Sequence, residues 1–317
     1  MLHVPINTIL AAPAAHRSAL SLPSPAPTDW PLLESLPPVN RNVFPIAFQA
    51  VERLSFWPLL QERMLGEAGL YVRHGFEALM LENVAGPYFV REDQPPVMYW
   101  VMRSLAERLS EAFPKLLKGI QVLAFADHWA MDIACVCGFQ FIRCESALFE
   151  GVRPEGRTPN RGNLAKLYMA RQQMLAPGQP EPQVYVDLQK KHTVFPRELE
   201  SLEPWLENIH FQKLEGVIIT GKATGHAVAE DDLRRAREAI EKTKATTTAT
   251  LGRPWDPPLL VGSGVTEDNL GMCLRYADGV IVGSALKQGG YWENPLAEDR
   301  VRSFSDAWKR NVALDKA

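Results

Sequence analysis

The sequence predicts an α/β fold, a single (β/α)8 TIM-barrel-like domain, from three observations. Short apolar runs alternate with amphipathic helical patterns along most of the 317 residues. The runs are continuous rather than alternating in polarity, as in parallel strands that are buried on both faces. Glycine-containing turns follow the last two runs, after Val261 and after Val282, where barrels of this class build a phosphate site. A doubly wound sheet is the alternative, but it calls for a GxGxxG turn that the sequence lacks.

We expect the chain to divide into two parts. Residues 1–55 are rich in Pro, Ser and Ala and form a divergent or partly disordered segment. This segment either contains the first strand, at His3–Ala11 or at Asn42–Phe48, or serves as a leader. Residues 56–317 form the barrel domain.

The barrel elements follow in chain order. Helical spacing begins at Phe56, and a strand at Phe76–Leu81 ends in Glu82 and Asn83. Further strands are expected at Ile120–Phe125, Gly138–Glu145, Val184–Asp187, Gly216–Gly221, Leu259–Val261 and Gly279–Val282. Helices are expected at residues 97–113, Trp129–Cys137, Asn163–Leu175 and Pro196–His210, and after an N-cap at Thr266. The Thr-rich stretch from Lys242 to Pro258 is expected to be a surface linker.

Composition excludes several classes of function. A net charge of −3 with no basic block gives no reason to expect a nucleic-acid partner. No apolar run reaches the roughly 18 residues that cross a bilayer, so membrane insertion is not expected. Four cysteines without a CxxC pair indicate reduced, buried thiols. We therefore expect a soluble cytoplasmic protein, with the mitochondrial matrix as the alternative.

Charged residues lie at several strand ends. Period two along Gly138–Glu145 places Arg143 and Glu145 on one face, either as a buried pair that binds substrate or as a structural salt bridge. Asp187 ends a later strand and is followed by Lys191 and His192. Such a cluster could transfer protons or hold an anion, or it could be a solvated turn.

The glycine turns are the candidate phosphate site. Their exposed backbone N–H groups would attract an anion, or the glycines would serve only tight turns. The candidate residues of this site are Gly262, Ser263, Gly264, Gly283 and Ser284, with Lys287 adding charge. The loop after Ile219 offers hydroxyls and open backbone for another part of the ligand, at Thr220, Gly221, Thr224 and Gly225.

Six motifs in this order resemble the BtpA family. They are IQVLA (120–124), GFQFIRCES (138–146), VDLQKKH (186–192), GVIITGKATG (216–225), LLVGSGVTEDN (259–269) and ADGVIVGSALKQGGYW (277–292). The resemblance implies a barrel and a role in photosystem I biogenesis in cyanobacteria, with relatives elsewhere whose reaction is unassigned. It matches Glu82, Asn83 and the candidate residues named above to family positions. Val84-Ala85-Gly86 departs from the family, which usually has an aspartate there, and so puts catalysis in doubt.

Two functions from different classes are consistent with these features. In the first, the protein binds and transforms a phosphorylated metabolite, a sugar phosphate or nucleotide, with Glu82 or Asp187 as general base and His192 or Lys191 as acid. In the second, it is a non-catalytic assembly factor. We assign no cofactor and no metal ligand, although carboxylates at Glu82, Glu145 and Asp187 would suit a divalent cation. A homo-oligomer is left open.

Overall fold

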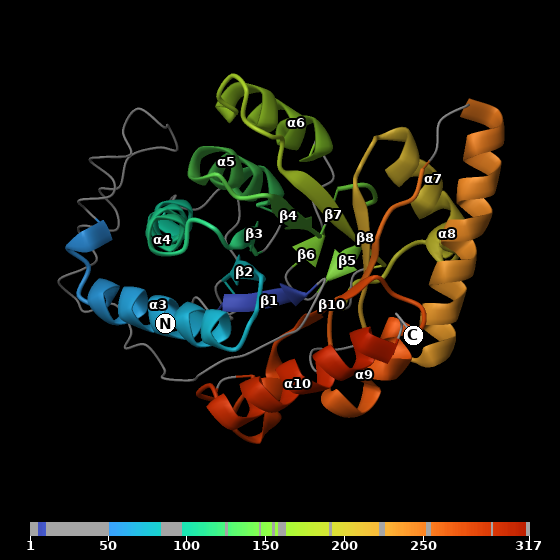
Figure 1. Cartoon of the computed structure of the whole chain (residues 1–317). Coiled ribbons are helices and arrows are strands. Elements are labelled where there is room, and N and C mark those ends of the chain that lie inside the picture. The colour runs from blue at the N-terminus through green and yellow to red at the C-terminus, as the bar shows by residue number, and fades with distance from the viewer. Residues whose placement is uncertain are drawn as a thin grey trace.

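A computed structural model of the chain describes a closed barrel surrounded by helices (Figure 1). The described residues are 6–10, 51–83, 97–123, 126–145, 147–153, 156–157, 163–189, 192–221, 226–251, 255–292 and 294–314. The barrel strands are β1 (Ile6–Leu10), β2 (Ala78–Glu82), β3 (Leu117–Gln121), β4 (Phe141–Cys144), β7 (Gln183–Leu188), β8 (Gly216–Ile219), β9 (Leu259–Val261) and β10 (Gly279–Val282). They pair in the order β1-β10-β9-β8-β7-β4-β3-β2. This confirms the predicted barrel-like fold.

The α-helices lie outside the barrel (Figure 1). They are α3 (Trp57–Arg73), α4 (Val97–Ala112), α5 (Asp127–Cys137), α6 (Asn163–Met174), α7 (Glu203–Phe211), α8 (Glu230–Leu251), α9 (Glu267–Leu274) and α10 (Glu298–Leu314). Short 3-10 helices are η3 (Arg197–Leu199), η4 (Ser284–Leu286) and η5 (Gln288–Gly290), and β5 (Val152–Arg153) pairs with β6 (Gly156–Arg157). In the described part of the chain, no helix is long and apolar enough to cross a membrane.

The first strand differs from a regular (β/α)8 barrel in its direction. The other seven barrel strands are parallel to one another, whereas β1 is antiparallel to both of its neighbours, β2 and β10. Ile6 lies opposite Leu81, and Leu10 lies opposite Val280. Residues 11–77 join β1 to β2, a connection much longer than a single crossover helix needs, and it permits an antiparallel β1. The strand lies within the first of the two predicted positions, and the second, 42–48, is outside the described residues.

Side chains of the strands divide between two apolar clusters. Leu79 and Leu81 of β2, for example, pack into the large cluster beneath the helices, whereas Met80 faces the barrel interior. The interior cluster is small and consists of Met80, Phe141, Ile218, Leu260 and Ile281, with Tyr185 packed against it. A barrel interior filled by layers of side chains is typical of this fold.

Several predicted elements differ in extent from the structure. The strand expected at Ile120–Phe125 is β3, which begins at Leu117 and ends at Gln121. The Thr-rich linker is a continuation of α8, because Thr246 and Thr247 donate their hydroxyls to the carbonyls of Lys242 and Thr243 four residues earlier. The helix expected at Pro196–His210 is interrupted between η3 and α7. Proline is tolerated only in the first turn of a helix, and Pro204 therefore lies at the start of α7.

Candidate functional site

Seven residues that point into the barrel form a layer at its carboxyl end. Each of the seven parallel strands contributes one, which lies near the end of the strand or directly after it. Each of these positions follows the interior apolar layer by two residues, or follows Gly119 on β3, so its side chain points inward. We call this layer the polar ring. Its members are Glu82, Gln121, Arg143, Asp187, Thr220, Gly262 and Gly283.

Arg143 and Asp187 form a buried ion pair in the polar ring. Arg143 Nη2 lies 3.0 Å from Asp187 Oδ1, and Arg143 Nε donates to both carboxylate oxygens at 3.2 and 3.3 Å. Burial alone would lower the pKa of Arg143, but Asp187, Glu82 and Glu145 hold this pKa above its ordinary value. Arg143 is therefore a fixed positive charge among carboxylates, and the ion pair involves Asp187 from the neighbouring strand.

The absence of a side chain at Gly262 allows the guanidinium of Arg143 to lie next to the carboxyl end of β9. A Cβ at this position would lie 3.2 Å from Arg143 Nη2 and 2.5 Å from Ile218 Cγ2. The backbone N–H of Gly262 donates to the carbonyl of Ile219 at 2.7 Å. Gly262 therefore shapes the ring through its lack of a side chain, and its N–H is already used within the sheet.

Gly221 and Gly264 lie against a common backbone segment. A Cβ at either residue would come within about 2 Å of the carbonyl oxygen of His226, and Gly264 also has a φ of 69°. Ser263 Oγ accepts a hydrogen bond from the Gly221 N–H at 3.0 Å. Close packing of the chain thus accounts for these two glycines. This agrees with the alternative interpretation that the glycines serve only tight turns. Within the described ranges, the N–H groups of Ser263 and Gly264 donate to no acceptor.

The second glycine turn lies beside the first. Val261 of β9 pairs with Val280 of β10, so residues 262–264 run alongside residues 281–283. Ser284 begins η4 directly after Gly283. Lys287 is fully buried and its Nζ donates to the carbonyl of Trp292 at 2.9 Å, which ties together the loop after β10.

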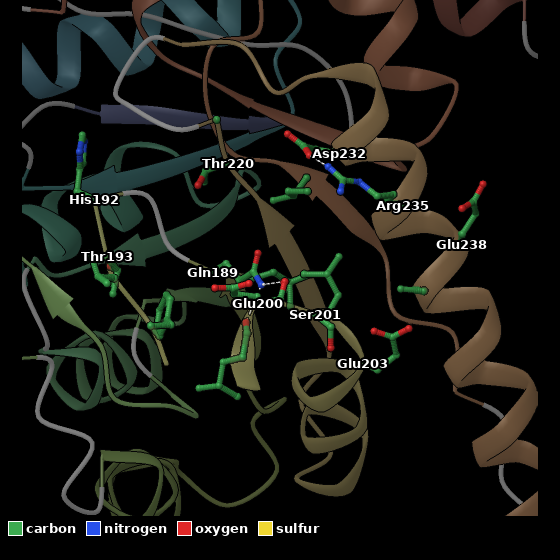
Figure 2. A pocket seen from close by; sticks show the side chains of 18 of the residues that line it. Gln189, His192, Thr193, Glu200, Ser201, Glu203, Thr220, Asp232, Arg235 and Glu238 are labelled. Atoms are coloured by element: carbon green, nitrogen blue, oxygen red, sulfur yellow. Dashed lines mark hydrogen bonds and ion pairs between the residues drawn. The ribbon is translucent and has the colours of Figure 1, made fainter. Parts of the chain in front are cut away.

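A cleft of about 920 Å³ opens beside the ring, between the carboxyl ends of β7 and β8 and helices α7 and α8 (Figure 2). Gln189, His192, Thr220 and Gly221 line its barrel side. The α8 side carries charges, and Asp232 and Arg235 point toward each other there (Figure 2). Thr220 belongs to both cleft and ring, because its Cγ2 lies 3.0 Å from the Cβ position of Gly262.

The loop after β7 holds an uncommon backbone conformation. Gln189 and His192 have φ values of 46° and 63°, which few residues other than glycine adopt. Gln189 Nε2 donates to the carbonyls of Leu199 and Glu200, both at 2.7 Å, and so anchors the loop to η3. His192 is exposed at the cleft. The predicted site residues Lys191, Thr224 and Gly225 lie outside the described residues.

Two further polar residues connect strand ends. Asn83 donates to the carbonyl of Leu123 at 2.7 Å and accepts from its N–H at 2.6 Å. Glu145 is buried, and its backbone N–H donates to Asp127 Oδ1 at 3.2 Å. Among the residues that the structure describes, no three His, Cys, Asp or Glu side chains are grouped to hold a metal ion.

Sequence analysis missed one member of the ring, Gln121. This residue is completely buried, and β3 pairs it with Glu82 of β2. An uncharged amide at a strand end carries no charge pattern. Strand alternation could have indicated it. Gln121 lies two residues after Gly119, and Gly119 faces the ring of Phe141 in the barrel interior.

Fold and ring together define a (β/α)8-type barrel protein that gathers charged and polar side chains at the carboxyl ends of its strands. A family model described as the BtpA family matches residues 60–310. The chain belongs to the BtpA family.

Several proteins are similar to this chain at low identity. An uncharacterised mitochondrial protein of Caenorhabditis elegans is 28% identical over 75% of this chain and 80% of its own length. The photosystem I biogenesis protein BtpA of Synechocystis is 28% identical over 78% of each chain. Among solved structures, an octameric ribulose-1,5-bisphosphate carboxylase/oxygenase of Pyrococcus horikoshii, in complex with sulfate ion, has a TM-score of 0.51 at 10% identity. That match covers 81% of this chain and 56% of that one, and it shows the fold alone.

Proposed function

We propose that this protein binds a small phosphorylated metabolite at the carboxyl end of the barrel and transforms it by proton transfer. The observation that carries the proposal is the polar ring. It places one arginine and two carboxylates in a buried layer, and it leaves glycines on β9 and β10. In barrels of this class, charged side chains at the carboxyl ends of the strands are the usual position of catalytic groups.

The ring suggests how the roles divide. Arg143 holds both oxygens of Asp187, so Asp187 orients the guanidinium toward the ligand. We assign the general base to Glu82, which faces the same layer, and the acid either to His192 at the edge of the cleft or to Lys191. The phosphate would lie at the paired turns, on the N–H groups of Ser263, Gly264, Gly283 and Ser284.

A panel of phosphate esters tests the proposal by thermal shift. A specific ligand raises the melting temperature by mass action, so at least one ester should raise that of the full chain. Gly264→Asp is a poor probe, because its Cβ would meet the backbone of residue 226. Ser284→Asp is better, since it places a negative charge at the proposed phosphate position and should abolish the shift.

Gln172→Asp is the matched control, because it adds the same charge on the exposed face of α6. This variant should respond to the esters as the wild type does. A panel in which no ester raises the melting temperature would remove the proposal. Equal responses of Ser284→Asp and the wild type would show that the phosphate does not bind at the second glycine turn.

A second function is favoured by one observation. The packing of residues 226–227 against Gly221 and Gly264 explains these glycines without a ligand. In that case the barrel would be a non-catalytic assembly factor, as the name of the Synechocystis relative suggests. Co-purification of a partner with the full chain, together with an unresponsive ester panel, would favour this function.

We also propose that the protein functions in a reducing compartment, the cytoplasm or the mitochondrial matrix. Cys135, Cys137, Cys144 and Cys273 are all buried and free. Reduced thiols suit the cytoplasm or the mitochondrial matrix, and one relative carries a mitochondrial name. Subcellular fractionation of tagged full-length protein would decide between these compartments.

A further inference from the structure

Gln121 differs from two other amides near the barrel, those of the buried Asn83 and the half-buried Gln140. It is completely buried, yet neither its Oε1 nor its Nε2 has a hydrogen-bond partner among the described residues. Asn83, by contrast, makes two hydrogen bonds with Leu123. Gln140 accepts from the Lys118 N–H and donates to the carbonyl of Gly138. Buried polar atoms in proteins are almost always paired, so an unpaired amide calls for an explanation.

The amide points into the polar ring. Gly119, two residues earlier on β3, faces the interior, where a Cβ would lie 1.6 Å from the ring of Phe141. Successive residues of a strand alternate between faces, so Gln121 points the same way. Its partner in the parallel register is Glu82. Gln121 therefore lies in the same layer as Glu82 and Arg143.

A second neutral group in this layer is also unpaired. Thr220 Oγ1 is buried and has no hydrogen-bond partner within the described ranges. An amide and a hydroxyl can each both donate and accept, whereas the neighbouring carboxylates only accept and Arg143 only donates. A ligand hydroxyl can also donate and accept at once, so a hydroxyl fits every member of this set. An alkyl group would leave Gln121 and Thr220 without partners.

We propose that Gln121 is a specificity-determining residue that binds a hydroxyl group of the ligand. The ligand of the proposed function, on which this inference rests, is then a phosphorylated sugar or polyol. Its phosphate lies toward β9 and β10, and its hydroxyl groups lie across the ring toward Gln121 and Glu82. A hydroxyl group of the ligand would supply the hydrogen-bond partner that the buried amide of Gln121 lacks within the described residues.

Calorimetry on the full chain tests the inference with two five-carbon esters, ribose 5-phosphate and n-pentyl phosphate. The wild type should bind the hydroxylated ester about tenfold or more tightly than the alkyl ester, as expected for one or two neutral hydrogen bonds. Gln121→Met has a similar volume without the amide. It should bind ribose 5-phosphate about tenfold more weakly than the wild type and bind n-pentyl phosphate unchanged.

The melting temperature of the free protein gives a second readout. Replacing an unpaired buried amide by an apolar side chain should leave the melting temperature unchanged or raise it. Gln140→Met is the matched control, since it removes a paired amide near the start of β4. This control should lower the melting temperature and leave the preference between the two esters intact.

The outcomes separate this inference from the proposed function. Equal affinity of the wild type for the two esters overturns the inference and leaves phosphate binding standing. A fall of several degrees in the melting temperature of Gln121→Met overturns it as well, because the amide is then paired within the chain. A wild type that binds neither ester overturns the inference, and the response to the full panel of esters then decides separately on the proposed function.

Discussion

Arg143 carries the single positive charge among the seven residues of the polar ring. Asp187 lies directly against it, and Glu82 and Glu145 also raise its pKa. Removing one member of a buried ion pair is costly, because the remaining charges stay buried without compensation. The stability of the barrel and the chemistry of its mouth therefore depend on the same side chain.

Arg143→Met should lower the free energy of unfolding by about 3 to 5 kcal/mol, as for other buried pairs that lose one partner. Urea unfolding followed by circular dichroism measures this change. Arg234→Met is the control, because Arg234 is an exposed residue that pairs with Asp231 and Glu238 on α8. Exposed pairs contribute less than about 1 kcal/mol. A loss of similar size in the two variants would contradict a special role for Arg143.

From the sequence, the face of the strand on which these side chains lie was easier to predict than the residues with which they interact. Period two along the predicted strand placed Arg143 and Glu145 on one face, because alternation is a local property of a strand. Its partner Asp187 comes from a strand 44 residues later, and only the closed sheet brings the two together. Gln121 was missed because an isolated amide has no distinguishing pattern, and its importance depends on the partners it lacks.

At the level of elements, α8 shows how tertiary structure overrides local propensity. Four threonines in its last turns favour a linker, because β-branched residues lower helix propensity. Burial of Thr243 and Thr247 favours the helix here, and the hydroxyls of Thr246 and Thr247 are satisfied within it by carbonyls four residues earlier. The strands β9 and β10 begin and end at the predicted residues, whereas β3 begins three residues before its predicted start at Ile120.

Thr246→Pro distinguishes a helix from a linker at this place. In a helix interior, proline removes a hydrogen bond and costs about 3 kcal/mol, whereas a linker tolerates it. The variant should therefore unfold at a clearly lower urea concentration than the wild type. Thr246→Ala is the control and should be neutral or slightly stabilising, because Thr246 is exposed and alanine favours a helix. Two variants of equal stability would favour the linker.

For the whole molecule, the regular alternation of strand and helix patterns was sufficient to predict the barrel. The direction of β1 could not be predicted, because the helix before β2 begins only at Trp57, and so long a connection allows either strand direction. The predicted boundary at residue 55 stays a prediction, since residues 11–50 lie outside the described ranges. The reaction also stays a proposal, because side chains from different strands combine to form the site.

Buried thiols make the stability of the whole fold depend on pH. Burial, with a further contribution from Asp132, raises the pKa of Cys135 to about 12, and burial raises that of Cys273 to about 11. In the unfolded chain both thiols would ionise near their ordinary value of 9.0. Between pH 9 and 11 the unfolded state therefore releases protons that the folded state keeps, and stability falls as pH rises.

Urea unfolding under reducing conditions at pH 8, 9, 10 and 10.5 measures this dependence. The wild type should lose stability progressively above pH 9. The double variant Cys135→Ala, Cys273→Ala should show a shallower decline, although it is less stable at pH 8 because two cavities are created. Parallel curves for the two proteins would assign the alkaline loss to other groups.

The antiparallel β1 closes the barrel at a place where the chain is joined only through the long stretch between residues 10 and 78. Ring closure here is thus a non-local event that must wait until distant parts of the chain have met. Without β1, the outer edges of β2 and β10 would present unpaired N–H and C=O groups, which readily pair with other chains. Residues 6–10, although far from β2 and β10 in sequence, therefore cover two strand edges at which copies of the chain would otherwise associate.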